Sequence, residues 1–158
     1  MTVSIHHLDH PPRYATAAVF LMWAFFFFLG IDIITPPLDG TILPGVTRES
    51  CITLLRSHSP VSPLGGLHPD MAVHVHEIPL TIGDLYKWSS ENRLLEAFGV
   101  GTAAVVSGIG MIGLDGHPDI QIPEHEGNLG TVGRALYDRI TDVQMGKTEF
   151  ADWSHVCV

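Results

Sequence analysis

A charge-free run of residues 15–31, ATAAVFLMWAFFFFLGI, constrains the fold more than any other part of the sequence. A membrane-spanning helix is one interpretation, but about 17 residues is the lower limit for crossing a hydrocarbon core. Arg13 is the nearby cation that would have to orient such a span. Aromatic and β-branched residues dominate the run, which is typical of buried strands. We therefore predict a buried hairpin with a break at Leu29–Gly30, and keep a membrane span as the alternative.

Length and composition limit the remaining possibilities. The chain has 158 residues, 46% of them hydrophobic, which is enough for one domain with a buried core. A net charge of −9 with only 8 Lys and Arg argues against nucleic acid as a partner, because phosphate contacts require clustered cations. Cys51 and Cys157 are far apart and form no CxxC pair. We therefore expect reduced thiols in an intracellular protein, without a zinc ribbon or disulfide framework.

After residue 34 the pattern alternates between helix and strand signals. Thr47 begins a predicted helix with apolar residues at helical spacing, and residues 57–70 form a loop rich in proline and glycine. In the predicted strand AVHVHEIPL, Val73 and Val75 face one side while His74 and His76 face the other. This alternation indicates a strand with one buried face.

The second half of the chain gives further helix and strand signals. Thr81 and Asp84 resemble a capping box, which starts a predicted helix ending near Arg93. Residues 102–122 are predicted to form strands with a turn at Asp115–Gly116. The clearest helix carries an apolar stripe and ends at Gly146, a residue suited to a C-terminal cap. Its stripe consists of Leu129, Val132, Leu136, Ile140 and Val143.

Two motifs resemble functional sites without the context that those sites require. Residues 108–113, GIGMIG, match the GxGxxG pattern of dinucleotide-binding proteins, but that pattern must open a helix. Here the segment leads into an Asp-Gly turn and another strand, so we expect no nucleotide site. The HVHE motif starting at His74 offers two metal ligands on one strand face. Other ligands at no diagnostic spacing are His117, Glu124 and His125, so we expect solvated histidines.

The stretch TPPLDGTILPGVTRES, residues 35–50, stiffens the backbone just before a predicted helix. It delivers Val46 and Thr47 to the first helical turn, where unpaired N–H groups and the helix dipole favour an anion such as phosphate. A second glycine-rich segment, residues 98–104, follows a predicted helix and could bring the Thr102 hydroxyl to the same anion. Alternatively, both segments are ordinary loops and Thr47 is a simple N-cap. By spacing alone we favour this alternative.

Four strings in the same order strongly resemble the branched-chain amino-acid aminotransferases. They are TPPLDGTILPGVTRES (35–50), RLLEAFGVGTAAVVS (93–107), DIQIPEHEGNLG (119–130) and RALYDRITDVQMGKTEFADWS (134–154). These relatives are pyridoxal-phosphate (PLP) enzymes of fold type IV. The resemblance implies an α+β fold, with residues 17–158 as the C-terminal part of the family's large domain and three main helices. We expect residues 1–16 to be a disordered tail.

The resemblance also implies roles for particular residues. The amides of Val46 and Thr47 would hold the cofactor phosphate, with the hydroxyl and amide of Thr102. Backbone N–H groups of Thr35 and Ala103 would bind the substrate α-carboxylate. Asp32 would take the place of a family glutamate that keeps the pyridine nitrogen protonated, although aspartate is shorter by one methylene.

One family feature has no counterpart in the sequence, namely the Schiff-base lysine that transamination requires. Lys87 and Lys147 match family positions that are not catalytic. We therefore expect no transamination by this chain alone, although the family moves amino groups between leucine, isoleucine or valine and 2-oxoglutarate. The alternative is a non-catalytic pseudoenzyme that dimerises with a full-length homologue. A gene-model fragment and a decayed paralogue also remain open, and the expected compartment is cytoplasmic or mitochondrial.

Overall fold

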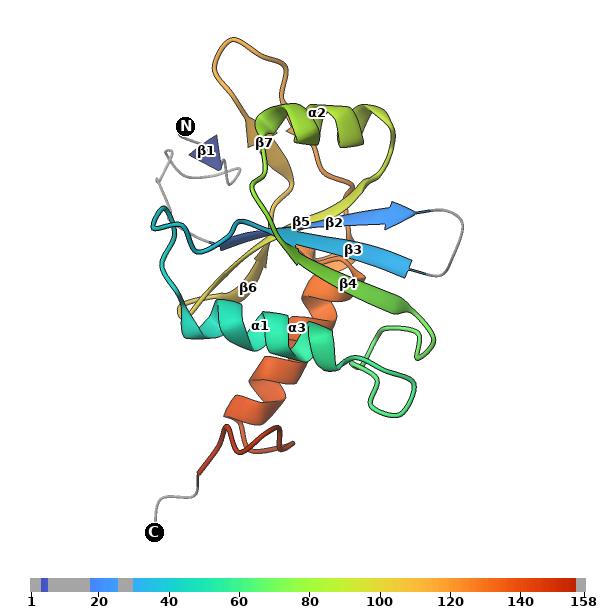
Figure 1. Cartoon of the computed structure of the whole chain (residues 1–158), viewed down its shortest axis with the longest axis vertical. Helices are drawn as coiled ribbons and strands as arrows, with labels where there is room; N and C mark the ends of the chain where they lie inside the picture. Colours follow the sequence, from blue (N-terminus) through green and yellow to red (C-terminus); the bar gives the residue numbers. More distant parts are fainter. Residues whose placement is uncertain (1–3, 6–17, 26–29, 156–158) are drawn as a thin grey trace.

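A computed structural model describes residues 4–5, 18–25 and 30–155. Within this part of the chain, two sheets and three α-helices form an α+β fold, as predicted (Figure 1). The larger sheet has the strand order β4-β3-β2-β5-β6 and the smaller one β1-β7-β8. The helices are α1 (Val46–Ser57), α2 (Ile82–Ser90) and α3 (Thr131–Gln144), and a 3₁₀ turn spans Glu126–Asn128. The strands are β1 (Ser4–Ile5), β2 (Ala18–Phe25), β3 (Gly30–Thr35), β4 (Ala72–Glu77), β5 (Leu94–Gly101), β6 (Val105–Gly108), β7 (Met111–Gly113) and β8 (Ile120–Gln121).

The described parts of the apolar run lie in two paired strands, as the hairpin prediction required, but the break predicted at Leu29–Gly30 is wrong for Gly30. β2 and β3 are antiparallel, with Leu21 opposite Ile34 and Phe25 opposite Gly30. Gly30 therefore belongs to a strand, and the connection falls in residues 26–29, outside the described residues. No helix in the described part of the chain is both long and apolar enough to cross a membrane. Of the predicted tail, Ser4–Ile5 pairs with β7, and the rest lies outside the described residues.

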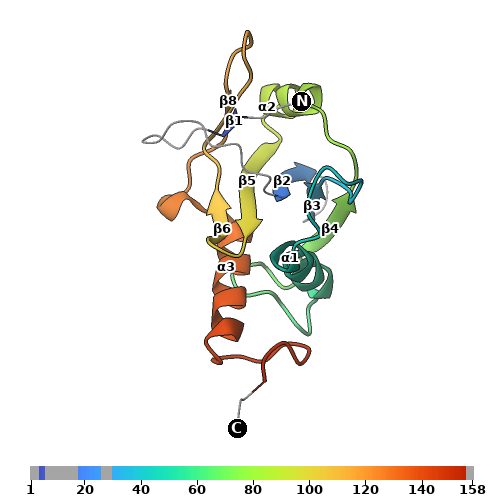
Figure 2. The same ribbon diagram turned by 90° about the vertical axis from the view of Figure 1, so that its left-hand side faces the viewer.

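One face of the larger sheet is covered by α1 and α3, and α2 lies on the other side (Figures 1 and 2). The apolar positions predicted for the first and last helices are buried in this structure, except Leu129, which is half-buried and precedes the start of α3. Ile33 from β3 and Phe98 from β5 are buried beneath these helices. They belong to one continuous main core with residues of α1 and α3. Val73 and Val75 pack on this core whereas His74 and His76 are exposed, as the strand pattern predicted. Gly146 has φ 68 just after α3, which confirms the predicted helix end.

A smaller core joins α2 to the strands beside it. Its buried residues are Leu85, Leu94, Ala97, Ile109, Ile112, Ile120 and Ile122. The predicted capping box is confirmed, because Thr81 Oγ1 accepts from the Asp84 amide at 3.2 Å and Asp84 Oδ2 from the Thr81 amide at 2.9 Å. The predicted end near Arg93 is wrong by three residues. Asn92 has φ 53, which a continuing helix does not allow, so α2 ends at Ser90.

The segment 98–104 is not the glycine-rich loop that the sequence predicted. Residues 98–101 belong to β5, where Gly99 pairs with Val19 of β2 and Ser107 of β6. Phe98 and Val100 are buried in the core, so their packing outweighs the low strand preference of Gly99 and Gly101. Only residues 102–104 form a turn. The GIGMIG segment runs through β6 and β7 into the turn before β8, which is the strand context predicted for it.

Candidate functional site

The first turn of α1 lies at the end of the proline-rich loop. The loop turns at Gly40, whose φ of 94 suits glycine, and reaches the helix at Gly45, the N-cap. Gly45 provides no side-chain hydrogen bond to the helix, so the simple N-cap role considered for Thr47 does not apply. The N–H groups in the first turn of an α-helix have no acceptor within the helix. In α1 these include the amides of Val46, Thr47 and Arg48. Val46 is 78% exposed, so this turn faces open space.

The other two α-helices have capped N-termini. The Thr81 side chain caps α2. At the start of α3, the carboxylate of Glu96 from β5 accepts from the amides of Val132 (3.2 Å) and Gly133 (3.0 Å). Of the three α-helices in the described residues, only α1 therefore presents a first turn without a side-chain cap.

Glu96 is a buried acid that our sequence reasoning did not single out. It is 1% exposed, and burial raises its pKa, whereas the hydrogen bonds from Gly133 and Val132 act in the opposite direction. The available signal was one acidic residue in the otherwise apolar strand LLEAFGVG. Such a residue at a core position indicates a polar partner across the core. Here that partner is the N-terminus of α3.

The turn between β5 and β6 carries Thr102 and Ala103. Both residues are exposed, and Val105 leaves the turn with φ 60. Figures 1 and 2 place this turn beside the start of α1. The structure thus brings four of the predicted site residues, Val46, Thr47, Thr102 and Ala103, to one side of the molecule.

The two predicted site residues on β3 point to opposite faces of the sheet. Thr35 is fully buried, and its Oγ1 has no hydrogen-bond partner among the described residues. Asp32 lies on the face opposite Ile33 and the α1 side, because side chains alternate along a strand. Its Oδ1 lies 2.8 Å from Nε2 of His76 on the neighbouring strand. The Asp32 carboxylate is therefore hydrogen-bonded to His76, and it does not face the start of α1.

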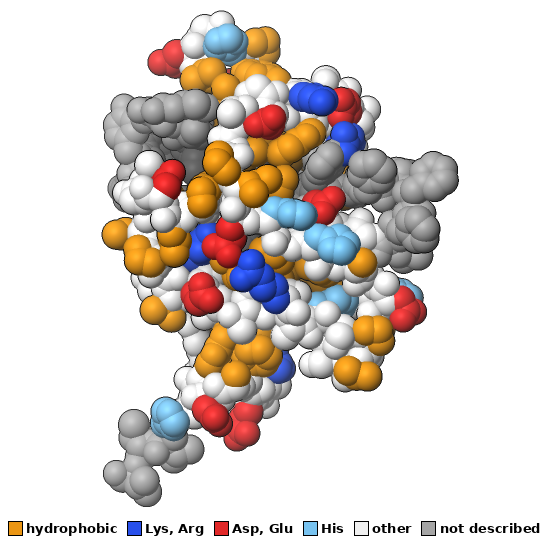
Figure 3. All heavy atoms as spheres, viewed as in Figure 1, with side chains coloured by type: hydrophobic (Ala, Val, Ile, Leu, Met, Phe, Trp, Pro, Cys, Tyr) orange, Lys and Arg blue, Asp and Glu red, His pale blue; other side chains and the backbone are white. Residues whose placement is uncertain are grey.

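The histidines on β4 lie on an exposed face of the strand. His74 and His76 are exposed, and histidine side chains are visible over the sheet in the space-filling view (Figure 3). No group of three His, Cys, Asp or Glu residues suited to a metal ion occurs in the described ranges. His125 contacts the carbonyl of Leu95 through Nε2 at 2.9 Å. Cys51 is buried and unpaired, and burial raises its pKa to about 12, so it is an inert thiol.

Comparison with known proteins decides the family. No family model matches the chain. Over 124 residues, or 78% of the chain, it is 36% identical to branched-chain-amino-acid transaminase 1 of Bacillus subtilis. Over 126 residues, or 79%, it is 40% identical to the cytosolic branched-chain-amino-acid aminotransferase of Saccharomyces cerevisiae. The chain is a partial homologue of the branched-chain aminotransferases.

The homology covers part of these proteins only. The chain spans 30% of the Bacillus transaminase and 31% of the yeast aminotransferase. The solved structure of the Escherichia coli branched-chain aminotransferase matches 87% of this chain and 34% of its own, with a TM-score of 0.56 and 26% identity. The α+β fold described above therefore matches part of the branched-chain aminotransferase fold, as the sequence resemblance implied.

The two lysines lie away from the start of α1. Lys87 is on α2, across the sheet from α1 (Figure 1). Lys147 follows α3, and its Nζ lies 3.0 Å from Oδ1 of Asp142. Neither lysine lies on α1 or on the turn between β5 and β6.

Proposed function

We propose that this chain binds the phosphate of PLP at the start of α1, using the amides of Val46 and Thr47 together with Thr102. The observation that carries the proposal is the uncapped first turn of α1, in contrast with the capped α2 and α3. A phosphate monoester has a charge of about −1.5 to −2 at pH 7 and several acceptor oxygens. It suits both the unpaired amides and the positive end of the helix dipole.

The neighbouring residues fit the same group. The hydroxyl and amide of Thr102 lie in an exposed turn beside α1, where they can donate to a bound phosphate. Ala103 adjoins Thr102, so its backbone N–H is our candidate for binding a substrate carboxylate. Thr35 fits this role less well, because its N–H faces β4 in the parallel ladder in which Thr35 pairs with Glu77. Bound PLP would supply an electron sink for substrate carbanions.

Asp32 fits the proposal less well than the other residues. Its carboxylate is hydrogen-bonded to His76 on the far face of β3. Contact with the pyridine nitrogen would require this bond to break and the group to reach the other side of the sheet. We therefore assign phosphate binding to Val46, Thr47 and Thr102, and we do not include Asp32 in the site.

The relatives are named as branched-chain-amino-acid transaminases, and their substrates would be amino acids and 2-oxo acids. We infer that this chain does not transaminate by itself, because the positions of Lys87 and Lys147 do not suit a Schiff base with a cofactor held at α1. It would then act as part of a larger aminotransferase. A cytosolic or mitochondrial location is consistent with the names of the two yeast relatives.

A non-catalytic module that pairs with a full-length aminotransferase is the second candidate. The observation in its favour is the apolar surface at the proline loop, where Leu38 is 50% exposed and Leu43 is 74% exposed. Exposed apolar groups next to a site are typical of surfaces that another protein covers. Sedimentation of the chain with and without a full-length homologue tests this candidate, and independent sedimentation would count against it.

The phosphate site is tested by calorimetric titration with two ligands. Pyridoxamine 5′-phosphate should bind saturably, whereas pyridoxamine, which lacks the phosphate, should not. Thr102→Val should weaken binding of the phosphorylated ligand, because it removes a hydroxyl donor. Ser90→Ala, at the end of α2, is the matched control and should leave binding unchanged. Equal affinity for both ligands would show that the phosphate is not recognised.

A further inference from the structure

A buried arginine lies in the turn proposed to bind phosphate. Arg48 is the third residue of α1 and is 2% exposed. This position is unfavourable for a cation, because the N-terminus of a helix is the positive end of its dipole. Burying a guanidinium also costs free energy unless it is paired. The contacts of Nη2 offset part of these costs, whereas Nε of Arg48 has no hydrogen-bond partner among the described residues.

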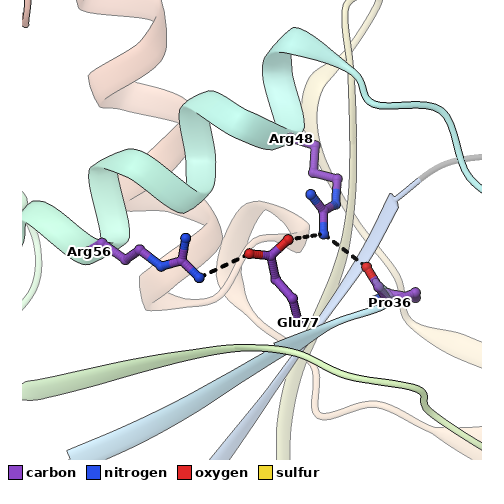
Figure 4. Close-up of polar contacts among 4 residues, drawn as sticks. All are labelled: Pro36, Arg48, Arg56 and Glu77. Atoms are coloured by element: carbon purple, nitrogen blue, oxygen red, sulfur yellow. Dashed lines mark hydrogen bonds and ion pairs between the residues drawn. The ribbon is translucent and has the colours of Figure 1, made fainter. Parts of the chain in front are cut away.

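Those contacts join three separate elements. Nη2 of Arg48 donates to the carbonyl of Pro36 at 2.9 Å and to Oε2 of Glu77 at 2.8 Å (Figure 4). Pro36 directly follows β3, and Glu77 is the last residue of β4. Arg48 thus links the first turn of α1 to the ends of two neighbouring strands. It also closes the loop that starts at Pro36 and leads into the helix.

The carboxylate partner remains charged. The hydrogen bond from Arg48 is the largest effect holding the pKa of Glu77 below its usual value, with a smaller contribution from Arg56. Arg56 donates to the other carboxylate oxygen, Oε1, at 3.0 Å (Figure 4). Unlike Arg48, it is 53% exposed and lies near the end of α1. The two arginines therefore share one carboxylate, but only Arg48 also holds the proline loop.

We propose that Arg48, held by Glu77, is a positioning residue that sets the place of the Val46 and Thr47 amides relative to the sheet. These two residues immediately precede Arg48 in the same turn, so any shift of Arg48 moves their N–H groups. This inference rests on the proposed phosphate site. Lysine at position 48 would keep the charge, but its Nζ lies one bond nearer the backbone than Nη2, the single arginine nitrogen that makes both contacts.

The test compares Arg48→Lys with Arg56→Lys, a matched change at the other partner of Glu77. The probe is pyridoxamine 5′-phosphate, titrated by calorimetry. We expect Arg48→Lys to weaken binding about tenfold, as loss of a charged hydrogen bond at this position would do. Arg56→Lys should change affinity less than about twofold, as an exposed ion pair implies. Equal losses in the two variants would overturn the positioning role and indicate a general effect of charge.

A second measurement does not depend on the ligand. The amide of Glu49 donates to the Gly45 carbonyl at 3.1 Å, and the amide of Gly45 to the Leu43 carbonyl at 2.8 Å. In the chain without ligand, hydrogen exchange at these two amides should be faster in Arg48→Lys than in the original chain, with α3 unchanged. If Arg48→Lys fails to fold, Glu77→Gln should show the same local increase.

Unchanged exchange in the folded variant would overturn the proposal. Absence of ligand binding with faster exchange would instead reject the phosphate site and support the positioning role.

Discussion

Thr35 shows how one buried atom links the fold to the candidate site. Its side chain is fully buried, and Oγ1 has no partner among the described residues. A buried hydroxyl without a hydrogen bond costs free energy, so its retention calls for an explanation. Thr35 directly precedes Pro36, where the loop that leads to α1 begins, and this position is consistent with a functional reason.

Replacement of Thr35 by valine tests whether the hydroxyl contributes to stability. Valine has nearly the same shape, so Thr35→Val should leave the free energy of unfolding unchanged or raise it by up to about 1 kcal/mol, because it removes an unsatisfied group. Urea unfolding of both chains measures the difference. A loss of more than about 1 kcal/mol would show that Oγ1 has a partner in the folded chain.

Glu77 predicts a specific dependence of stability on acid. Its pKa is lowered from 4.5, mainly by the hydrogen bond from Arg48. A group with a lowered folded-state pKa stabilises the fold above its unfolded pKa, and this contribution is lost as pH falls through the folded value. Glu77→Gln should therefore be less stable than the original chain at pH 6, with the difference shrinking below about pH 4.5. A difference independent of pH would contradict the linkage.

At the scale of elements, the three helices differ in how their N-termini are satisfied. α2 uses its own threonine, α3 uses a glutamate from β5, and α1 has no side-chain cap. The sequence predicted the cap of α2 because both partners lie within four residues. It did not predict that of α3, because Glu96 and Val132 are far apart in sequence and only the fold brings them together.

The cap of α2 gives a measurable prediction. Thr81→Ala removes the hydroxyl that accepts from the Asp84 amide and should lower the free energy of unfolding by about 1 kcal/mol. Thr41→Ala is a suitable control, since Thr41 is an exposed loop residue whose hydroxyl bonds only to Asp39 nearby. Equal losses in the two variants would argue against a specific role for the cap.

Element boundaries failed where packing overrode local preference. The glycines around Phe98 suggested a loop, but the central place of β5 between β2 and β6 fixes these residues in a strand. The helix α2 ended early because Asn92 adopts a left-handed conformation, which residue order alone did not reveal. The apolar stripe of α3 was predicted well from Val132 to Val143, because its periodicity and its burial agree there, whereas Leu129 precedes the helix.

At the scale of the whole molecule, the chain spans about 30% of the length of its curated relatives. The family resemblance predicted Val46, Thr47 and Thr102 as site residues, and the structure brings their segments to one side (Figure 2). The resemblance could not show that Asp32 faces the other side of β3, since its direction depends on strand alternation and on His76.

The central claim is that the uncapped turn of α1 and the β5–β6 turn bind one phosphate together. Backbone ¹H–¹⁵N NMR during titration with pyridoxamine 5′-phosphate tests it most directly. We expect saturable shifts at the amides of Val46, Thr47 and Thr102 with one common dissociation constant, and no shifts at Asp84 or Val132 in the capped helices. Shifts confined to one of the two turns, or no saturable shift at these three amides, would contradict the claim.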